Sequence, residues 1–313
     1  MAKRPEINGL YSLVFIAGLL TGCSRSEDLI PNPDPVAGMP LRIKWQAGDK
    51  YKQHVMVIEN IEATVPRVTF PIEIYADVSV DRTITASRQL PDGWELELEF
   101  VALAMESSEG EHKLLYYDST KSADQWIGSF EPLCREIGQR LHYLTDTNGK
   151  VEKITDYDKF LRVVAGDDSK TARLGKWMTE DSLKKIFDLT SDLPDHPVNF
   201  GDWWKVKTQF SVGQLAGVEM DLDFTFRRLE QYKNINCARL DFSGTCSAFE
   251  MEISGVKFSF ENSDVSGTEW FDPARGMLVE KAFNVNLHGQ IVVAGQSAKA
   301  ILHLTANIQM QKF

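Results

Sequence analysis

The side chains that could carry chemistry in this sequence are few and widely spaced. No histidine belongs to the His-Glu-x-x-His pattern, which brings two imidazoles and a carboxylate to one metal ion. No Gly-x-Ser-x-Gly elbow, P-loop or glycine-rich dinucleotide motif follows a predicted strand. We therefore predict that the protein is not an enzyme and that it holds no cofactor. The six histidines are His54, His112, His142, His196, His288 and His303.

Two of these histidines could meet across a hairpin near the C-terminus. Apolar and polar residues alternate on both sides of a turn predicted at residues 294–297. That turn would pair Leu287 with Leu304 and would set His288 opposite His303. Two imidazoles alone make a weak zinc or copper site, so we predict that no metal is bound there.

Two aspartates stand in similar short blocks, "YLTDTNGKVEK" (143–153) and "WFDPARGMLVEK" (270–281). A calcium site needs about six or more oxygen ligands, and the alternating carboxylates of a calcium loop are missing from both blocks. Aspartate favours turns, and a glycine shortly after it accepts positive φ. We therefore predict that Asp146 and Asp272 are hairpin-turn residues.

These blocks are the third of three matched pairs, which indicates an internal repeat. The other pairs are "GDKYKQHVMV" from Gly48 with "GDWWKVKTQF" from Gly201, and "IEIYADVSVDR" (72–82) with "VEMDLDFTFRR" (218–228). The pairs occur in the same order along the chain. They predict two similar β-rich halves, 41–155 and 198–313, of which the first carries an insertion around residues 108–141.

Most of both halves alternates with period two, which is typical of antiparallel strands with one buried face. In "WELELEF" (94–100) the apolar residues share one face and three glutamates share the other. The glutamate row is predicted to be a solvated face. The turn signal "LPDG" (90–93) predicts a hairpin between residues 78–88 and 94–104.

Helices are expected only in the middle of the chain, at 155–166 and 179–194, with a shorter one at about 130–140. The first two lie in a connector, 156–197, which should cover one apolar sheet face. The predicted fold class is α+β, mostly antiparallel β. Its two repeated curved-sheet halves would form either one strongly coiled sheet or two half-barrels, with the helices inserted between them.

The net charge of the chain limits its possible partners, and the spacing of its cysteines indicates the state of their thiols. The net charge of −11 disfavours nucleic acid and tight docking on anionic lipid. There is no Cys-x-x-Cys motif, and on one continuous strand Cys237 and Cys246 would point to opposite faces. We predict that these two are free, buried thiols.

The N-terminus has the three parts of a secretory signal. Lys3 and Arg4 precede an apolar run of eleven residues from Leu10 to Leu20, which is too short to span a hydrocarbon core of about 30 Å. The run ends in Leu20-Thr21-Gly22-Cys23, which resembles the lipobox of bacterial lipoproteins. The resemblance implies that residues 1–22 are removed and that the Cys23 sulfur carries a diacylglycerol anchor. The alternative is an ordinary signal peptide with an incidental cysteine.

The residues that follow support an anchored arrangement. Residues 23–40 contain four prolines and no periodicity, which predicts a semi-extended tether. Ser24 stands where an aspartate would favour retention at the inner membrane. We therefore expect a periplasm-facing protein on the outer membrane rather than the inner membrane.

The mature chain resembles an uncharacterised family of bacterial envelope lipoproteins, a domain of unknown function. The resemblance rests on the lipobox, on Gly201–Trp204, and on the blocks 144–154 and 270–281. It implies the location and the type of fold, and it transfers no catalytic residues. The curved halves are also similar to the lipoprotein-carrier and lipid-binding folds of the envelope.

Three hypotheses about function follow. The first is a tethered protein that binds a hydrophobic ligand or another envelope component. The second is a structural or interaction lipoprotein without a ligand cavity. The third is a hydrolase of an unrecognised type.

Overall fold

The computed structural model describes seven stretches of the chain and the backbone of Gly22–Cys23. These stretches are residues 38–64, 72–127, 135–166, 179–212, 215–253, 256–293 and 296–313. The predicted signal sequence up to Thr21 and the tether residues 24–37 lie outside the described residues.

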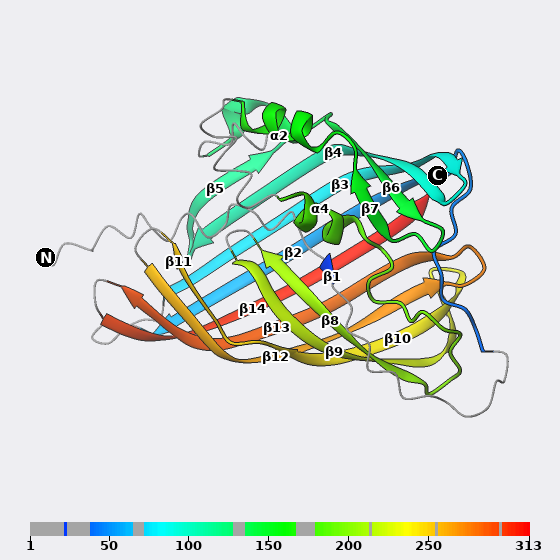
Figure 1. Cartoon of the computed structure of the whole chain (residues 1–313). Coiled ribbons are helices and arrows are strands. Elements are labelled where there is room, and N and C mark those ends of the chain that lie inside the picture. The colour runs from blue at the N-terminus through cyan, green and yellow to red at the C-terminus, as the bar shows by residue number, and fades with distance from the viewer. Residues whose placement is uncertain are drawn as a thin grey trace, which may run out of the picture.

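The described chain is dominated by one mostly antiparallel sheet of 14 strands. The strands are β1 (Gly22–Cys23), β2 (Lys50–Thr64), β3 (Ile72–Leu90), β4 (Gly93–Glu109), β5 (His112–Asp118), β6 (Arg140–Asp146), β7 (Val151–Ile154), β8 (Trp203–Val212), β9 (Leu215–Tyr232), β10 (Ile235–Cys246), β11 (Phe249–Ile253), β12 (Val256–Asp272), β13 (Met277–Val293) and β14 (Gln296–Lys312). Their order in the sheet is β1-β8-β9-β10-β12-β13-β14-β2-β3-β4-β6-β7. β11 pairs with β12 and β5 with β4, beside this path. Figure 1 shows the sheet curving round so that β8 and β9 pass in front of β14 and β2.

The matched sequence blocks fall on equivalent strands of this sheet. The first pair lies at the starts of β2 and β8, the second lies in β3 and β9, and the third spans β6–β7 and β12–β13. The orders β2-β3-β4-β6-β7 and β8-β9-β10-β12-β13 therefore correspond strand by strand. Of the two expected arrangements, the structure shows one continuous curved sheet, in which β14 joins the two series of strands.

One face of the sheet is buried and the other is partly or fully exposed. On β2, Val55, Val57 and Ile61 are buried and alternate with residues that face outward. The predicted hairpin of 78–88 with 94–104 is confirmed, because β3 pairs with β4 and Leu90 lies opposite Gly93. Period-two alternation thus assigned the faces of these strands correctly.

The predicted register of the C-terminal hairpin is wrong by two residues. Val293 pairs with Gln296, so β13 and β14 are joined through residues 294–295 rather than 294–297. Leu287 consequently pairs with Leu302. A shift of two positions leaves every side chain on its predicted face, so the hydrophobic pattern could not detect the error.

Two α-helices are described, and they lie in the predicted connector. α2 (Tyr157–Ala165) ends at Gly166, whose left-handed φ of 81° stops the helix. α4 (Glu180–Phe187) begins at Thr179, whose hydroxyl accepts a hydrogen bond from the Ser182 amide at 3.1 Å.

α4 is shorter than the predicted 179–194. The Asp188 carboxylate accepts hydrogen bonds from the Thr190 amide (2.8 Å) and hydroxyl (2.6 Å), which turns the chain out of the helix. A short 3-10 helix, η2, covers Ala123–Gln125. Of the helix predicted at about 130–140, residues 130–134 lie outside the described residues; the described part is helical only at residues 135–136, and β6 already begins at Arg140.

The helices cover part of the buried face, as expected. Phe160 of α2 stacks on Phe100 of β4, with ring centroids 5.5 Å apart. Phe187 of α4 contacts Tyr143 of β6 at 5.7 Å. α2 packs on β6, and α4 packs on β7 and β1. Figure 1 shows α4 inside the curve of the sheet and α2 near one end of it.

Candidate functional site

The predicted anchor residues are only partly described. The backbone of Gly22 and Cys23 forms β1, which pairs with the edge strand β8 and places Cys23 opposite Thr208. Leu20 and Thr21 lie outside the described residues. Lipid attachment at Cys23 therefore stays a prediction.

The histidine pair expected across the last hairpin is not formed. His288 lies opposite Ile301, and His303 lies opposite Asn286, with 2.7 Å between His303 Nδ1 and Asn286 Oδ1. Within the seven described stretches, no group of three or more histidine, cysteine, aspartate or glutamate residues is placed to hold a metal ion.

The two block aspartates are turn residues, as predicted. Asp146 Oδ1 accepts hydrogen bonds from the amides of Asn148 (2.8 Å) and Lys150 (2.9 Å). Asp272 Oδ1 does the same for Ala274 (2.9 Å) and Arg275 (3.0 Å). Gly149 and Gly276 take the positive φ values, 93° and 65°, that these turns require. Each carboxylate thus stabilises its own turn by accepting hydrogen bonds from backbone amides.

The two described thiols, Cys237 and Cys246, are also as predicted. Both are free and buried. Burial raises the pKa of each to about 11, so neither is a thiolate at neutral pH.

The most unusual polar group on the buried face is Glu59 of β2. Its side chain is only 5% exposed, and it lies between Ala76 of β3 and Leu304 of β14. Glu59 Oε1 has no hydrogen-bond partner among the described residues. Burial raises the pKa of Glu59 to about 7, and no neighbouring charge among the described residues offsets the effect. The carboxyl group is therefore poised between its neutral and ionised forms near neutral pH.

A second buried polar cluster surrounds Lys281 of β13. Its ammonium group forms an ion pair with Asp192, which follows α4 in the chain. Glu269 of β12 lies directly opposite Lys281, and burial raises the pKa of Glu269. The Lys281 Nζ atom also lies 5.2 Å from the ring centroid of Phe242 and 5.6 Å from that of Phe283. The positive charge of Lys281 is compensated within this cluster, because the ammonium group lies near two carboxyl groups and the faces of aromatic rings.

Arg82 of β3 is the third buried charge. Its guanidinium donates to Gln53 Oε1 at 3.3 Å and lies 5.4 Å from the Phe100 ring centroid and 5.9 Å from that of Phe187. Burial lowers the pKa of Arg82 to about 10, which leaves it charged at neutral pH. It therefore lies where α4 meets the sheet, and its contacts there are structural.

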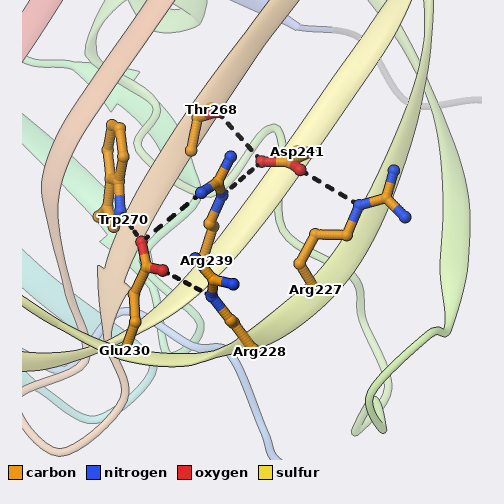
Figure 2. Close-up of polar contacts among 7 residues, drawn as sticks. All are labelled: Arg227, Arg228, Glu230, Arg239, Asp241, Thr268 and Trp270. Atoms are coloured by element: carbon orange, nitrogen blue, oxygen red, sulfur yellow. Dashed lines mark hydrogen bonds and ion pairs between the residues drawn. The ribbon is translucent and has the colours of Figure 1, made fainter.

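The outer face carries a separate polar network across β9, β10 and β12, shown in Figure 2. Glu230 accepts hydrogen bonds from Trp270 and Arg228, each at 2.7 Å. Asp241 accepts from Arg239 (2.8 Å), Arg227 (3.2 Å) and Thr268 (3.0 Å). The hydrogen bond from Trp270 is the largest cause of the lowered pKa of Glu230. Both carboxylates accept hydrogen bonds from side chains of β9, β10 and β12, so the network links these neighbouring strands on the outer face.

His142 of β6 joins the outer face to α2. Its Nδ1 atom lies 3.0 Å from Asp156 Oδ2, and its Nε2 atom lies 3.1 Å from Glu97 Oε2. The hydrogen bond with Asp156 is the main cause of the raised pKa of His142, and Glu97 adds to it. Asp156 is also the residue that precedes α2, so the imidazole ties the start of this helix to the sheet.

The sequence interpretation missed Glu59, Lys281 and Arg82, although a signal for them was present. Glu59 occurs in phase with the buried residues Val57 and Ile61, and Lys281 in phase with Phe283. A charged residue at an inward position of an alternating strand is a marker of a buried polar group.

Comparisons with known proteins show no family for this chain. No protein-family model matches it, and no curated protein matches its sequence. Two similar solved structures each share 8% identity. DynF, from the dynemicin biosynthesis pathway of Micromonospora chersina, aligns over 91% of this chain and 92% of its own, with a TM-score of 0.23. An outer membrane channel from Pseudomonas putida F1 aligns over 90% of this chain and 100% of its own, with a TM-score of 0.19. At these TM-scores neither likeness carries an argument about function.

Proposed function

We propose that this protein is a membrane-anchored binding protein of the bacterial cell envelope, which holds an apolar ligand against the buried face of its sheet without catalysing a reaction. One observation carries the proposal. The buried face runs without interruption through strands of both halves and is apolar around Glu59, which has no partner among the described residues. An apolar surface with a few placed polar groups is the usual lining of a ligand site.

The breadth of the sheet favours space for such a ligand. Closed sheets of about eight strands are just filled by their own side chains, and larger ones enclose more room. The described sheet is curved but not closed, since the strands at its two ends are not paired with each other. Here eleven strands, from β8 to β7, lie along the path of the curved sheet when β1 is left out, because the proposed processing would remove Gly22. The described helices pack mainly on β6 and β7, at one end of it, and reach Phe100 of β4 and Arg82 of β3.

The middle of the buried face is lined by small side chains, which also leave room. Six buried alanines lie on β2, β3 and β14: Ala63, Ala76, Ala86, Ala298, Ala300 and Ala306.

The anchor in this proposal is the lipid expected on Cys23, followed by the tether 24–40. No helix in the described part of the chain has the length and apolar character needed to cross a membrane. Attachment through acyl chains would place the sheet on the periplasmic side of the membrane. The outer membrane is the favoured one.

Native mass spectrometry of residues 24–313, expressed in the bacterial periplasm, tests the binding proposal. We expect a protein mass with an additional apolar molecule, which organic extraction releases. A fluorescent apolar probe should then bind the extracted protein with saturation. If the protein is recovered without a bound molecule and the probe does not bind, the proposal is wrong.

A matched pair of variants locates the site. Ala306→Phe fills the buried face, whereas Ala102→Phe adds the same ring on the outward-facing side of β4. We expect Ala306→Phe to weaken probe binding and Ala102→Phe to leave it unchanged. Equal effects of the two substitutions would place the probe elsewhere on the protein.

A structural or interaction role is the second candidate. It is favoured by Lys281–Asp192 and Arg82, which fill one region of the buried face with compensated charges and hold the connector there. In that case the interior would be filled by the chain itself, and the mass spectrum would show the protein alone.

A further inference from the structure

Glu59 breaks the rule that buried polar groups are hydrogen-bonded. Its neighbours on the same face are apolar: Ala76 and Leu304 across the strands, and Val57 and Ile61 along β2. Oε1 is buried without a partner among the described residues. Burying a carboxyl group in this way is unfavourable for folding, and nothing in its described surroundings offsets the penalty.

The two buried cations that the described residues place on this face are too far away to compensate Glu59. Arg82 lies opposite Gln53, six residues along β2 from Glu59, which corresponds to about 20 Å of strand. Lys281 lies opposite Ile308, which pairs with Val55, so it is displaced from Glu59 along the strands and by two strands across the sheet. Both cations already have partners.

The other buried polar residue in this row of the sheet is also out of reach. Ser107 of β4 lies opposite Ala76 and is therefore two strands from Glu59. This separation corresponds to about 10 Å, which exceeds hydrogen-bonding distance.

We infer that Glu59 is the polar contact for the bound ligand, and that the ligand is an apolar chain carrying a hydrogen-bond donor such as a hydroxyl, amide or ammonium group. This inference rests on the proposed function and names the class of ligand. A carboxylate oxygen accepts hydrogen bonds from each of these groups. A ligand ending in a carboxylate would instead bring a second negative charge to the same apolar site, which is unfavourable. Free fatty acids are therefore disfavoured.

Four probes with unbranched twelve-carbon chains test this assignment at pH 8: dodecylamine, dodecanol, methyl laurate and laurate. Each is measured by displacement of the fluorescent probe from the extracted protein. We expect the two donors to bind about tenfold more tightly than methyl laurate, which only accepts hydrogen bonds, and laurate to bind most weakly.

Three variants test whether the Glu59 side chain causes the preference for hydrogen-bond donors. Glu59→Leu should abolish the advantage of the donors, whereas Glu59→Gln should keep that of dodecanol and lose that of dodecylamine. Glu62→Leu is the control, because Glu62 lies on the same strand but is exposed. It should retain the full preference.

The possible failures are distinguishable. If the four probes bind the unaltered protein equally well, or if laurate binds best, the assignment of Glu59 is wrong and apolar binding still stands. A donor preference that survives in Glu59→Leu also overturns the assignment. If none of the probes binds, the proposed function itself fails. The series on the unaltered protein needs no variant to fold.

Discussion

Lys281 on β13 and Asp192 in the segment after α4 form a buried ion pair between residues 89 positions apart in the sequence. The Asp192 carbonyl also accepts a hydrogen bond from Trp204 Nε1 of β8 at 2.9 Å. The segment after α4 is thus fastened to strands from two parts of the sheet. This arrangement fixes the connector over the buried face.

Replacing Lys281 with methionine should be strongly destabilising. The substitution keeps the length of the side chain but removes the Lys281 ammonium group from its place beside the buried carboxyl groups of Asp192 and Glu269. We expect the free energy of unfolding to fall by about 3–5 kcal/mol, measured by urea denaturation. Lys299→Met on β14 is the control, since Lys299 is exposed and should change stability by about 0.5 kcal/mol or less. Equal effects at the two positions would show that the ion pair does not hold the connector.

Glu59 should make stability depend on pH. The folded state raises the pKa of Glu59 from its ordinary value of 4.5 to about 7, so the folded protein holds this proton more tightly than the unfolded chain. The resulting penalty is absent below about pH 4.5, grows as the pH rises and is complete above about pH 7. Glu59→Gln should therefore be more stable than the unaltered protein by about 3 kcal/mol at pH 8, and similar to it at pH 4.5.

Urea denaturation of the ligand-free protein at several pH values measures this difference. Glu62→Gln, an exposed change on the same strand, should show a difference that does not vary with pH. A constant difference for Glu59→Gln would mean that the buried carboxyl does not titrate as inferred.

His142 should stabilise the folded protein at low pH and lose this effect as the pH rises. Hydrogen bonds with Asp156 and Glu97 raise the pKa of His142 above its ordinary value of 6.5. Its contribution is complete below pH 6.5 and is lost as the pH rises through the folded-state pKa. We expect His142→Gln to lower the Tm more at pH 6 than at pH 9. His288→Gln, at an exposed outer-face position, should lower it little at either pH. If His142→Gln lowers the Tm equally at both pH values, protonated His142 does not stabilise the protein through Asp156 and Glu97.

The anchor hypothesis has a direct test in cell fractionation. Cys23→Ser removes the thiol that would receive the diacylglycerol group. We expect the unaltered protein to sediment with membranes and the variant to be found in the soluble periplasmic fraction. Labelling with a radioactive fatty acid should be lost at the same time. Continued membrane association of the processed variant would show that another feature of the protein holds it there.

Alternation of apolar and polar residues was enough to predict the faces of the strands. Phe283 and Leu304 are buried as expected, and so are Leu96, Leu98 and Phe100 of β4, whereas Trp94 on the same face is partly buried. The register of β13 with β14 could not be obtained in this way, because a slip of two residues preserves both faces. The register is set by the pairing of Val293 with Gln296, and the sequence between them is equally compatible with the longer turn that was predicted.

The candidate site was less predictable than the fold. Glu59 could have been found from its phase with Val57 and Ile61, but its lack of a partner depends on which strands lie beside β2. β14 comes from the far end of the chain, and no local pattern indicates that Leu304 will be the neighbour of Glu59. In the same way, the sequence around Lys281 does not identify Asp192 as its counter-ion.

The pairing of β14 with β2 also sets the order in which the protein can fold. Lys312 pairs with Tyr51, so the contact that unites the two series of strands joins opposite ends of the described body. Hairpins such as β3–β4 can form from neighbouring residues, whereas this pairing requires closure of a very long loop. Until the last strand is available, β2 and β13 each keep an unpaired edge, the kind of edge that promotes aggregation. A chain that emerges N-terminus first would therefore need protection until β14 has been released.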